Sequence, residues 1–453
     1  MPQKDDSSER ETVAADAGWE GHDVKDKLAA QRVWIAHLRG EVGPNLPALT
    51  DRQWACLAEE AMRHRLRGLT YRRVADGPLA DQVPSHVRDK LRSSYVDGAS
   101  RNALFFRQTA QMARELAARG IPLMLLKGMH LSRFVYAEPG LRSMADVDVM
   151  VRREHLAEAE QVYIERGFGP LPRPDLEQFC TWSNHLAKMH KVGAPVVELH
   201  WSIEKPANPF SIDHDGLWAR SRAASLEGAL VHILSPEDLL LHLALHGTYH
   251  HRLDHAALKG LMDVDAVIAK HANDIDWQVL TERARAWGAS GFVYSTFRLA
   301  TEILGTPFPP STLRSLPHQR ADDDVVDVAR RFILMPRLEL PKVYVELAQS
   351  HNFRQRSMLV LRNIFLPRER MERVYELRTG TPLVYAYYGI RLADLVKKRS
   401  VELFRALFVT RGMQHTLDRE EERLRIVKWV KDPTGQTRNQ QSEGTSEEQR
   451  PSA

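Results

Sequence analysis

The feature that most constrains the fold is a change of hydrophobic period near residue 121. Before it, apolar residues recur at helical intervals, and a helix is expected from about Ser100 to Arg119, with Gly120 as its stop. Residues 121–126 (IPLMLL) then form a short continuous apolar run, which is typical of a strand buried on both faces. The sequence therefore predicts a sheet-containing unit that begins here, after a helical lead-in.

Alternating strand and helix signals continue through the next eighty or so residues. The expected elements are a glycine turn at Lys127-Gly128, a helix at 129–136, a turn at Pro139-Gly140, a strand at 146–151, a helix at about 153–166 that ends at Gly167, and two extended runs, 185–191 and 196–201, around a hairpin loop at 192–195. This order predicts a small core that mixes strands and helices.

Helical patterns flank this core on both sides. Thr50-Asp51 is a plausible N-cap before an apolar helical run, and the segment Ser235 to Asp238 is a credible helix start. We therefore expect an α+β protein in which helical domains flank a core with a mixed sheet. Its expected parts are a disordered tail (1–24), a helical N-terminal domain (25–100), the core (101–232), a helical C-terminal domain (233–432) and a second disordered tail (433–453).

Composition limits the partners and the compartment. The 453 residues include 63 Lys+Arg and 59 Asp+Glu, so the net charge of +4 is small and does not imply a nucleic-acid partner. Cys56 and Cys180 are the two cysteines, too few for a disulfide framework or a cysteine-rich zinc module, and we expect a reducing, cytoplasmic setting. No run approaches the roughly 18 apolar residues of a membrane span, and the acidic, polar start is unlike a secretory signal.

An acidic pair stands out in the strand at 146–151. Asp146 and Asp148 are two residues apart, so a strand directs both to one face, while the intervening valines point into the opposite, apolar layer. In the run 196–201, the same alternation puts Glu198 and His200 on the face opposite Val197. If these strands are neighbours, a third carboxylate joins the pair.

Three carboxylates in one cleft require cations. Two of them about 6 Å apart repel each other by about 3 kcal/mol at an effective dielectric constant near 20. Hard cations such as Mg²⁺ or Mn²⁺ prefer oxygen ligands, and two such ions serve in-line phosphoryl chemistry. Asp146, Asp148 and Glu198 are therefore predicted to be the metal ligands and catalytic residues. For His200 we favour a hydrogen bond to one of the metal ligands, or a packing role, over direct binding of the metal.

Three residues near the glycine turn are candidates for holding phosphate. Gly128 would allow close backbone approach, the following helix would offer free amides, and Lys127 or Arg142 would add charged contacts. Two simpler interpretations remain open. Lys127 could be a solvated lysine at a strand end, and Arg142 could be the structural partner of an acid in its own loop.

The three motifs together resemble a known family. LLKGMHLSRFVY, LRSMADVDVMV and VVELHW are similar to the uncharacterised nucleotidyltransferase family of the DNA polymerase beta-like superfamily. Further similarity runs through Leu234 to Asp238, His246-Gly247, Asp263, Ile275 to Trp277 and Leu366-Pro367. The resemblance implies a small polymerase-beta-like nucleotidyltransferase core with metal-binding carboxylates at Asp146, Asp148 and Glu198. One departure is Met129, because the superfamily usually has serine after this glycine.

The implied activity is metal-dependent transfer of an NMP from an NTP, such as ATP, to a hydroxyl, with release of pyrophosphate. Two Mg²⁺ or Mn²⁺ ions are the implied cofactors. The acceptor is open: a small molecule, a sugar, a peptide, a protein or a tRNA end all fit. The alternative is a catalytically inactive binding module that keeps the fold and recognises a partner through its helical flanks.

Two other segments have a simpler interpretation beside a functional one. The histidines from His242 to His255 include an i, i+4 series that could bind zinc, but the surrounding leucines favour a packed helix. Residues 391–432 are dense in both charges with helically spaced apolar residues, which favours a solvated helix face over a nucleic-acid surface.

Overall fold

The computed structural model describes residues 21–41, 46–77, 79–170, 175–253, 257–334 and 422–431, together with shorter pieces between 354 and 391. The chain divides into two compact units. One comprises Met1–Leu28 with Met335–Arg425, and the other Ala29–Leu334 with Ile426–Ala453. Of the predicted disordered tail 1–24, residues 1–20 lie outside the described residues and residues 21–24 are helical. The predicted tail 433–453 and most of the charged segment 391–432 also lie outside the described residues.

Among the described residues, seven strands form one mixed sheet in the order β3-β4-β5-β2-β1-β7-β6. They are β1 (Met124–Leu125), β2 (Asp146–Met150), β3 (Gly169–Pro170), β4 (Met189–His190), β5 (Val196–His200), β6 (Arg222–Leu226) and β7 (Ala229–Ile233). β2 lies parallel to β5 and antiparallel to β1, and β1 lies parallel to β7. β4 and β5 are antiparallel, as the predicted hairpin requires. The predicted α+β class with a mixed sheet is confirmed.

Helices precede the sheet and connect its strands. Those before it are α2 (Gly21–Leu38), α3 (Asp51–Arg63), α4 (Arg67–Thr70), η1 (Tyr71–Ala75), η2 (Ala80–Gln82) and α5 (Ser85–Ala117). Those between strands are α6 (Lys127–His130), η3 (Leu131–Val135), η4 (Pro139–Leu141), η5 (Arg153–His155), α7 (Leu156–Glu165), α8 (Leu176–Cys180) and α9 (His214–Ala219). Thr50 and Gln53 exchange side-chain and backbone hydrogen bonds at the start of α3, which confirms the predicted cap.

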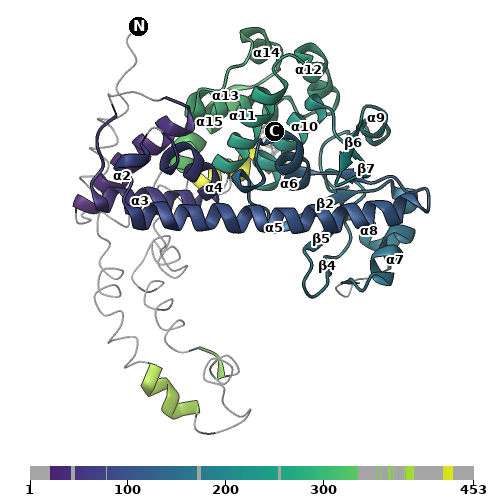
Figure 1. The fold of residues 1–453 in the computed structure, drawn as a ribbon, viewed down its shortest axis with the longest axis horizontal. Helices are drawn as coiled ribbons and strands as arrows, with labels where there is room; N and C mark the ends of the chain where they lie inside the picture. Colours follow the sequence, from purple (N-terminus) through teal and green to yellow (C-terminus); the bar gives the residue numbers. More distant parts are fainter. Residues whose placement is uncertain are drawn as a thin grey trace, which may run out of the picture. The chain divides into compact units, whose positions relative to one another are not determined.

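The long helix α5 begins at Ser85, earlier than the predicted start near Ser100 (Figure 1). The sequence does not predict this start, because Gly98 and the polar residues before it interrupt the helical spacing of apolar residues. In the structure this part of α5 packs tightly on η4, since a Cβ added to Gly140 would lie 2.5 Å from the Tyr95 ring. Close packing between two segments thus supports a helix that local periodicity does not reveal.

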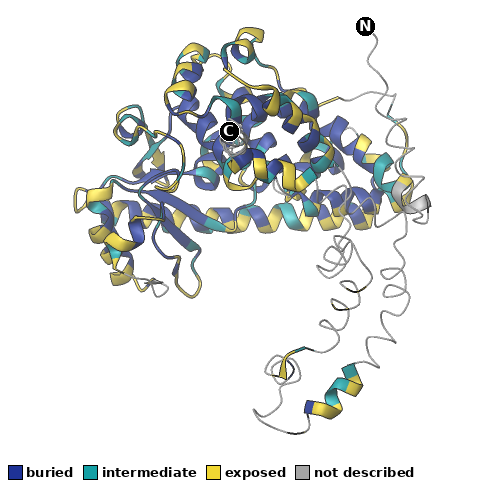
Figure 2. Cartoon of the chain, turned by 180° about the vertical axis from the view of Figure 1, so that it is seen from behind, coloured by how far each residue is buried: buried dark blue, intermediate teal, exposed yellow. Residues whose placement is uncertain are grey.

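The two faces of the sheet pack against different helices. One face shares a core with α5 and α7, and its contributors from β2 and β5 are Val147, Val149, Val197 and Leu199. Met124 and Met150 point the other way, into a core with α10, α11 and α13. Both sides of the central strands are therefore buried (Figure 2). The residues that alternate with the valines of β2 and β5 face the second helical layer.

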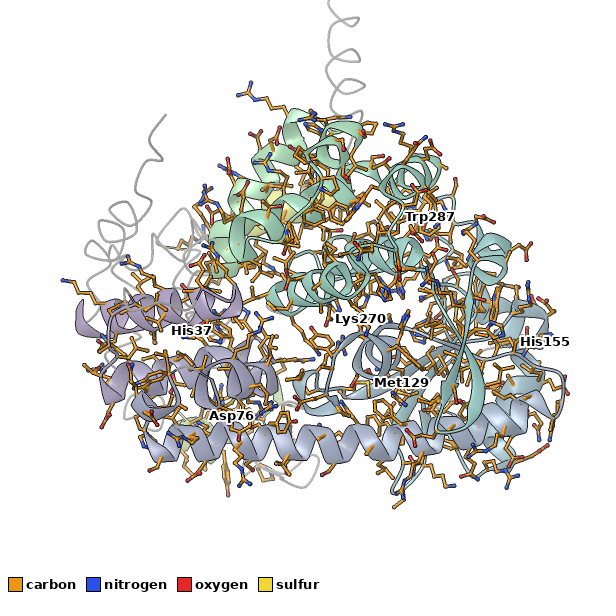
Figure 3. All side chains as sticks on the ribbon, turned by 45° about the horizontal axis from the view of Figure 1, so that its top comes forward. His37, Asp76, Met129, His155, Lys270 and Trp287 are labelled. Carbon is orange, nitrogen blue, oxygen red and sulfur yellow. The ribbon has the colours of Figure 1, made fainter. Side chains whose placement is uncertain are left out.

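This second layer follows β7. Its helices are α10 (Pro236–Leu245), η6 (His246–His250), α11 (Ala257–His271), α12 (Trp277–Ala286), α13 (Ser290–Leu304), α14 (Pro310–Ser315) and α15 (Arg320–Leu334). Ser235 caps α10 by accepting from the Asp238 amide, as predicted. Trp287, labelled in Figure 3, is buried in the core of this layer. Across the described ranges, no helix is both long enough and apolar enough to span a membrane.

Residues near the C-terminal end also contribute to the structure. Residues 422–431 are helical, and the Trp429 indole donates a 2.7 Å hydrogen bond to Asp322 while packing on Phe292. In the other compact unit, residues 384–391 are helical, and the Tyr388 hydroxyl donates to the carbonyl of Leu366.

Candidate active site

Strands β2 and β5 place the predicted carboxylates next to each other. In their parallel register, Asp148 lies opposite Glu198, and Asp146 lies opposite Val196. Because neighbouring strands are separated by roughly 4.8 Å, side chains on the same face of such a pair touch. The strand that carries Glu198 therefore neighbours the strand that carries Asp146 and Asp148, which is what a site with three carboxylates requires.

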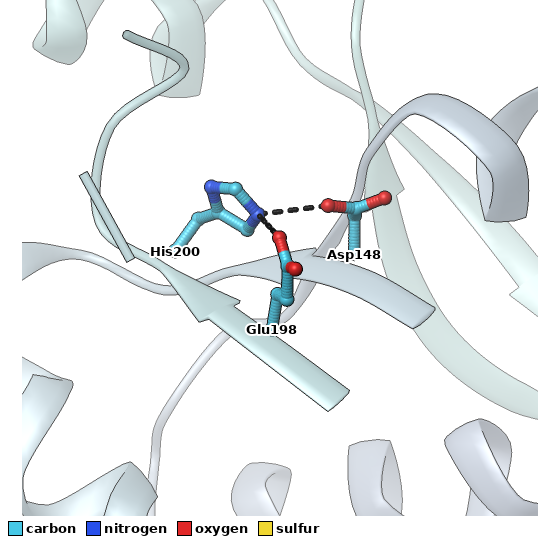
Figure 4. Close-up of side chains that lie close together, drawn as sticks. All are labelled: Asp148, Glu198 and His200. Carbon is cyan, nitrogen blue, oxygen red and sulfur yellow. Dashed lines mark hydrogen bonds and ion pairs between the residues drawn. The ribbon is translucent and has the colours of Figure 1, made fainter. Parts of the chain in front are cut away.

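Asp148, Glu198 and His200 meet in one buried cluster (Figure 4). His200 Nε2 lies 2.9 Å from Asp148 Oδ1 and 3.6 Å from Glu198 Oε2. Ligand atoms from the three residues all lie within 4.8 Å of one another, so they could hold a metal ion. Within the described part of the chain, no other group of three or more His, Cys, Asp or Glu residues meets this condition.

His200 thus lies closer to the acids than its predicted supporting role required. Its second ring nitrogen, Nδ1, is 3.4 Å from the side-chain amide of Asn184, which fixes the ring in front of Asp148. Asp146 is half-buried at the edge of the cluster and is not one of its three members. The structure therefore brings together two of the three predicted ligands with His200, and sets Asp146 beside them.

Two lysines balance the acids. Lys127 Nζ lies 2.9 Å from Asp148 Oδ1, and Lys188 Nζ lies 2.6 Å from Glu198 Oε1. The Lys127 side chain is 14% exposed, whereas that of Lys188 is 46% exposed. Lys127 is therefore not the solvated strand-end lysine of the simpler interpretation. Lys188 was missed from the sequence because it lies before β4, in a segment that shows no motif.

The pKa values reflect these contacts. Burial alone would raise the pKa of Asp148, but the Lys127 ammonium and His200 outweigh burial and hold it well below its usual range. At Glu198 burial is likewise outweighed, by His200 and Lys188, and the pKa falls to about 2. The pKa of Asp146 is raised, first by burial and then by the charges of the other two acids. Negative charge is thus in excess around Asp146.

The predicted glycine turn is a tightly packed corner. Lys127 has a φ of 36°, in the left-handed region that non-glycine residues rarely adopt. The amide of Leu126 donates to the Asp148 carbonyl at 3.1 Å, which ties the turn to β2. A Cβ on Gly128 would lie 2.9 Å from Arg142 Nη1 and 3.0 Å from Met144 Sδ. Packing alone therefore explains the glycine, and its approach to a phosphate stays a prediction.

Arg142 has a structural partner, but not one from its own loop. Its Nε and Nη2 atoms each donate at 2.9 Å to the two carboxylate oxygens of Asp263 on α11. The Tyr136 hydroxyl donates to the same carboxylate at 2.9 Å. The Arg142 and Asp263 side chains are 11% and 4% exposed. This geometry joins α11 to the segment that enters β2 and leaves the phosphate-binding role of Arg142 a prediction.

The histidine segment is mainly a packed helix, as favoured. The leucines of α10 are buried, and His242 is fully buried among them. His246 Nε2 lies 3.1 Å from His251 Nε2, and His250 Nδ1 lies 3.7 Å from Glu204 Oε2. The described residues thus offer a pair of close ring nitrogens here rather than the three or four ligands of a zinc site. His255 lies outside the described residues.

The donor set on β2 and β5 fits a divalent cation. Asp148 and Glu198 are ionised, buried and adjacent, which is costly for two carboxylates unless positive charge accompanies them. Their oxygens suit Mg²⁺ or Mn²⁺, and the His200 nitrogen is also compatible with Mn²⁺. Burial, and then the charges of Asp148 and Glu198, raise the pKa of Asp146, so a cation beside it would favour its ionised form.

Comparison with known proteins identifies the family of this chain. The family model described as "Uncharacterised nucleotidyltransferase" matches residues 50–305, which is more than half of the chain and includes the whole sheet. Among solved structures, an antigenic nucleotidyltransferase-like protein from Paracoccidioides brasiliensis is similar, with 17% sequence identity, coverage of 46% of this chain and 96% of that chain, and a TM-score of 0.29. Comparison with curated proteins gave no match. On the family match, this chain belongs to the uncharacterised nucleotidyltransferase family.

Proposed function

We propose that this chain is a metal-dependent nucleotidyltransferase that moves an NMP from an NTP to an acceptor hydroxyl and releases pyrophosphate. The observation that carries the proposal is the β2–β5 register, which sets Asp148 opposite Glu198 with His200 beside both. Membership in the family supplies the reaction class. The acidic cluster supplies a site where this chemistry could occur.

In the proposed site, Asp146, Asp148 and Glu198 would hold two Mg²⁺ or Mn²⁺ ions. When bound, such ions neutralise phosphate charge and make a hydroxyl easier to deprotonate. His200 orients Asp148 through its 2.9 Å contact, and Asn184 keeps the ring in that orientation. A cation at Asp148 would compete with Lys127, whose ammonium would then be available to a phosphate oxygen.

The proposed reaction is an in-line displacement at the α-phosphorus. The acceptor oxygen forms a bond to phosphorus, the bond to the bridging oxygen breaks, and pyrophosphate leaves with the electron pair. Glu198 helps to remove the proton of the hydroxyl, which passes on to solvent. The same carboxylates would serve any NTP and any acceptor with a free hydroxyl: a small molecule, a sugar, a peptide, a protein or a tRNA end.

The test is release of pyrophosphate and transfer of label from each NTP, with Mg²⁺ or Mn²⁺, in the presence of cell extract as a source of acceptors. Mass spectrometry of labelled products would identify the acceptor. Asp148→Asn should abolish transfer, whereas Asp81→Asn, at an exposed aspartate of η2, should not change it. Transfer that persists in Asp148→Asn and in EDTA would refute the proposal.

A second candidate is a non-catalytic module with this fold. It is favoured by the ion pairs of Lys127 with Asp148 and Lys188 with Glu198, because each carboxylate already has a cationic partner. This candidate predicts no change in the electron paramagnetic resonance of Mn²⁺ when protein is added. Mn²⁺ binding that disappears in Asp148→Asn would exclude it.

A further inference from the structure

Helix α11 brings a second lysine to the entrance of β2. Lys259 and Asp263 are one helical turn apart, and both contact the segment that leads into Asp146. Lys259 Nζ donates to the Ser143 carbonyl at 3.0 Å, and Asp263 holds Arg142. The Lys259 ammonium group is therefore held next to the segment that leads from Ser143 to Asp146.

The charge of Lys259 has no anionic partner among the described residues. Its hydrogen bond goes to a neutral carbonyl, and none of the ion pairs formed by these residues includes it. The side chain as a whole is neither fully buried nor exposed. An ammonium has three N–H donors, and only one hydrogen bond of Lys259, to the Ser143 carbonyl, is found among the described residues, so donors remain for an anion.

The surroundings of Lys259 explain why it is held in this state. Arg142 and Arg65 repel its charge, and Asp263 and Asp146 attract it. Both carboxylate oxygens of Asp263 already accept hydrogen bonds from Arg142, so Asp263 stabilises the charge of Lys259 only weakly. Burial is the largest influence, and together these effects lower the pKa of Lys259 to about 7. A phosphate group would replace the missing negative charge.

The local alternatives for holding phosphate are weak. The residue after Gly128 is Met129, which has no hydroxyl, and α6 is a helix of only four residues. Lys127 is engaged by Asp148. Even when released from Asp148, Lys127 would contribute a single positive charge, and α11 can add a second because it is joined to the segment that carries Asp146.

We propose that Lys259 binds the β- or γ-phosphate of the NTP, so that α11 supplies the polyphosphate contact that the turn at Gly128 lacks. This inference rests on the proposed function for the identity of the ligand. It assigns Lys259 to binding, not to the chemical step. The competing interpretation is that Lys259 only fastens the Ser143 carbonyl.

Lys259→Gln separates the two roles, because glutamine keeps an N–H donor for the Ser143 carbonyl and removes the charge. Binding of tripolyphosphate with Mg²⁺, measured by calorimetry, should weaken about tenfold in Lys259→Gln, since a hydrogen bond to a charged group is lost. Lys259→Arg should retain binding. The control is Lys270→Gln, an exposed lysine on the same helix (Figure 3).

Two further readouts identify the cause of any failure. Mn²⁺ binding at Asp148 should be unchanged in Lys259→Gln, and in the transfer assay KM for the NTP should rise while kcat changes little. Tripolyphosphate binding equal in wild type and Lys259→Gln, or undetectable in wild type, would overturn the inference. Lysine-dependent binding without nucleotidyl transfer would instead reject the proposed function and leave the anion site standing.

Discussion

The Asp148 cluster and the Arg142–Asp263 pair are two buried ionic groups at opposite ends of one short segment, and they are balanced differently. Asp263 receives two hydrogen bonds from Arg142 and one from Tyr136, so its charge is fully matched. In the cluster, Asp148 and Glu198 face each other, and one of their cationic partners, Lys188, is half exposed. A matched ion pair such as Arg142–Asp263 stabilises the contact between two segments. A cluster in which carboxylates outnumber the lysines paired with them is suited to bind a metal ion.

The comparison predicts its largest effect at Asp148. Asp148→Asn keeps the size of the side chain but removes the charge that a cation would bind. We expect transfer to fall by about a thousandfold or more, because charge stabilisation by a bound cation contributes several kcal/mol. Rates of pyrophosphate release and Mn²⁺ binding are the measurements. Unfolding in urea should change far less than activity, which would show that the cluster is functional and not structural.

The second effect concerns stability. Asp263→Ala leaves the Arg142 guanidinium buried and unpaired, and removal of one partner from such a pair costs about 3–5 kcal/mol. The free energy of unfolding in urea should fall by that amount. In the double variant Arg142→Met/Asp263→Leu no unpaired charge remains, so most of the stability should return. A double variant no more stable than Asp263→Ala would show that the pair does not act as a matched unit.

The sequence predicts the cluster better than it predicts the pair. Alternation with period two places Asp146 and Asp148 on one face of a strand and Glu198 on one face of another. The motifs that resemble the family contain the same three carboxylates. Arg142 and Asp263 are far apart in sequence, and no local pattern joins them. The register of β2 with β5 is likewise a tertiary property, because the two strands are not consecutive in the chain.

The positively charged groups of the site were hardest to predict. Lys188 and Lys259 lie in segments whose local patterns indicate only an extended run and a helix, and their roles depend on which residues of other elements they approach. A single useful signal existed for α11: Asp263 was among the residues that carry the family resemblance, yet nothing in the sequence tied it to Arg142. The early start of α5 was missed for the same reason, since packing on Gly140 and not periodicity supports it.

The third effect is a pH dependence that contrasts the two lysines. Lys127 is paired with Asp148, which together with the neighbouring acids outweighs burial and raises its pKa, so it stays charged. Lys259 has a pKa of about 7 and faces Arg142, Arg65, Asp263 and Asp146. Only the charged form of Lys259 attracts phosphate, so affinity should fall as pH rises through about 7.

The apparent dissociation constant of tripolyphosphate should therefore rise about tenfold between pH values of about 6 and about 8. Lys259→Arg stays charged over this range and should reduce the change to that of the ligand itself. Calorimetry at both pH values makes the comparison. Equal pH dependence in wild type and Lys259→Arg would remove Lys259 from the binding of phosphate.

The smallest effect is expected at Lys188, the most exposed partner of the acidic cluster. Its ion pair with Glu198 competes with any metal for the same carboxylate, and a partly exposed pair is worth at most about 1 kcal/mol. Lys188→Ala should therefore increase Mn²⁺ affinity by up to about fivefold and change the free energy of unfolding little. Lys188→Arg keeps the competing charge and should bind Mn²⁺ as wild type does. Weaker Mn²⁺ binding in Lys188→Ala would mean that Lys188 helps to shape the site, and the two ionic groups would then differ less than their geometry indicates.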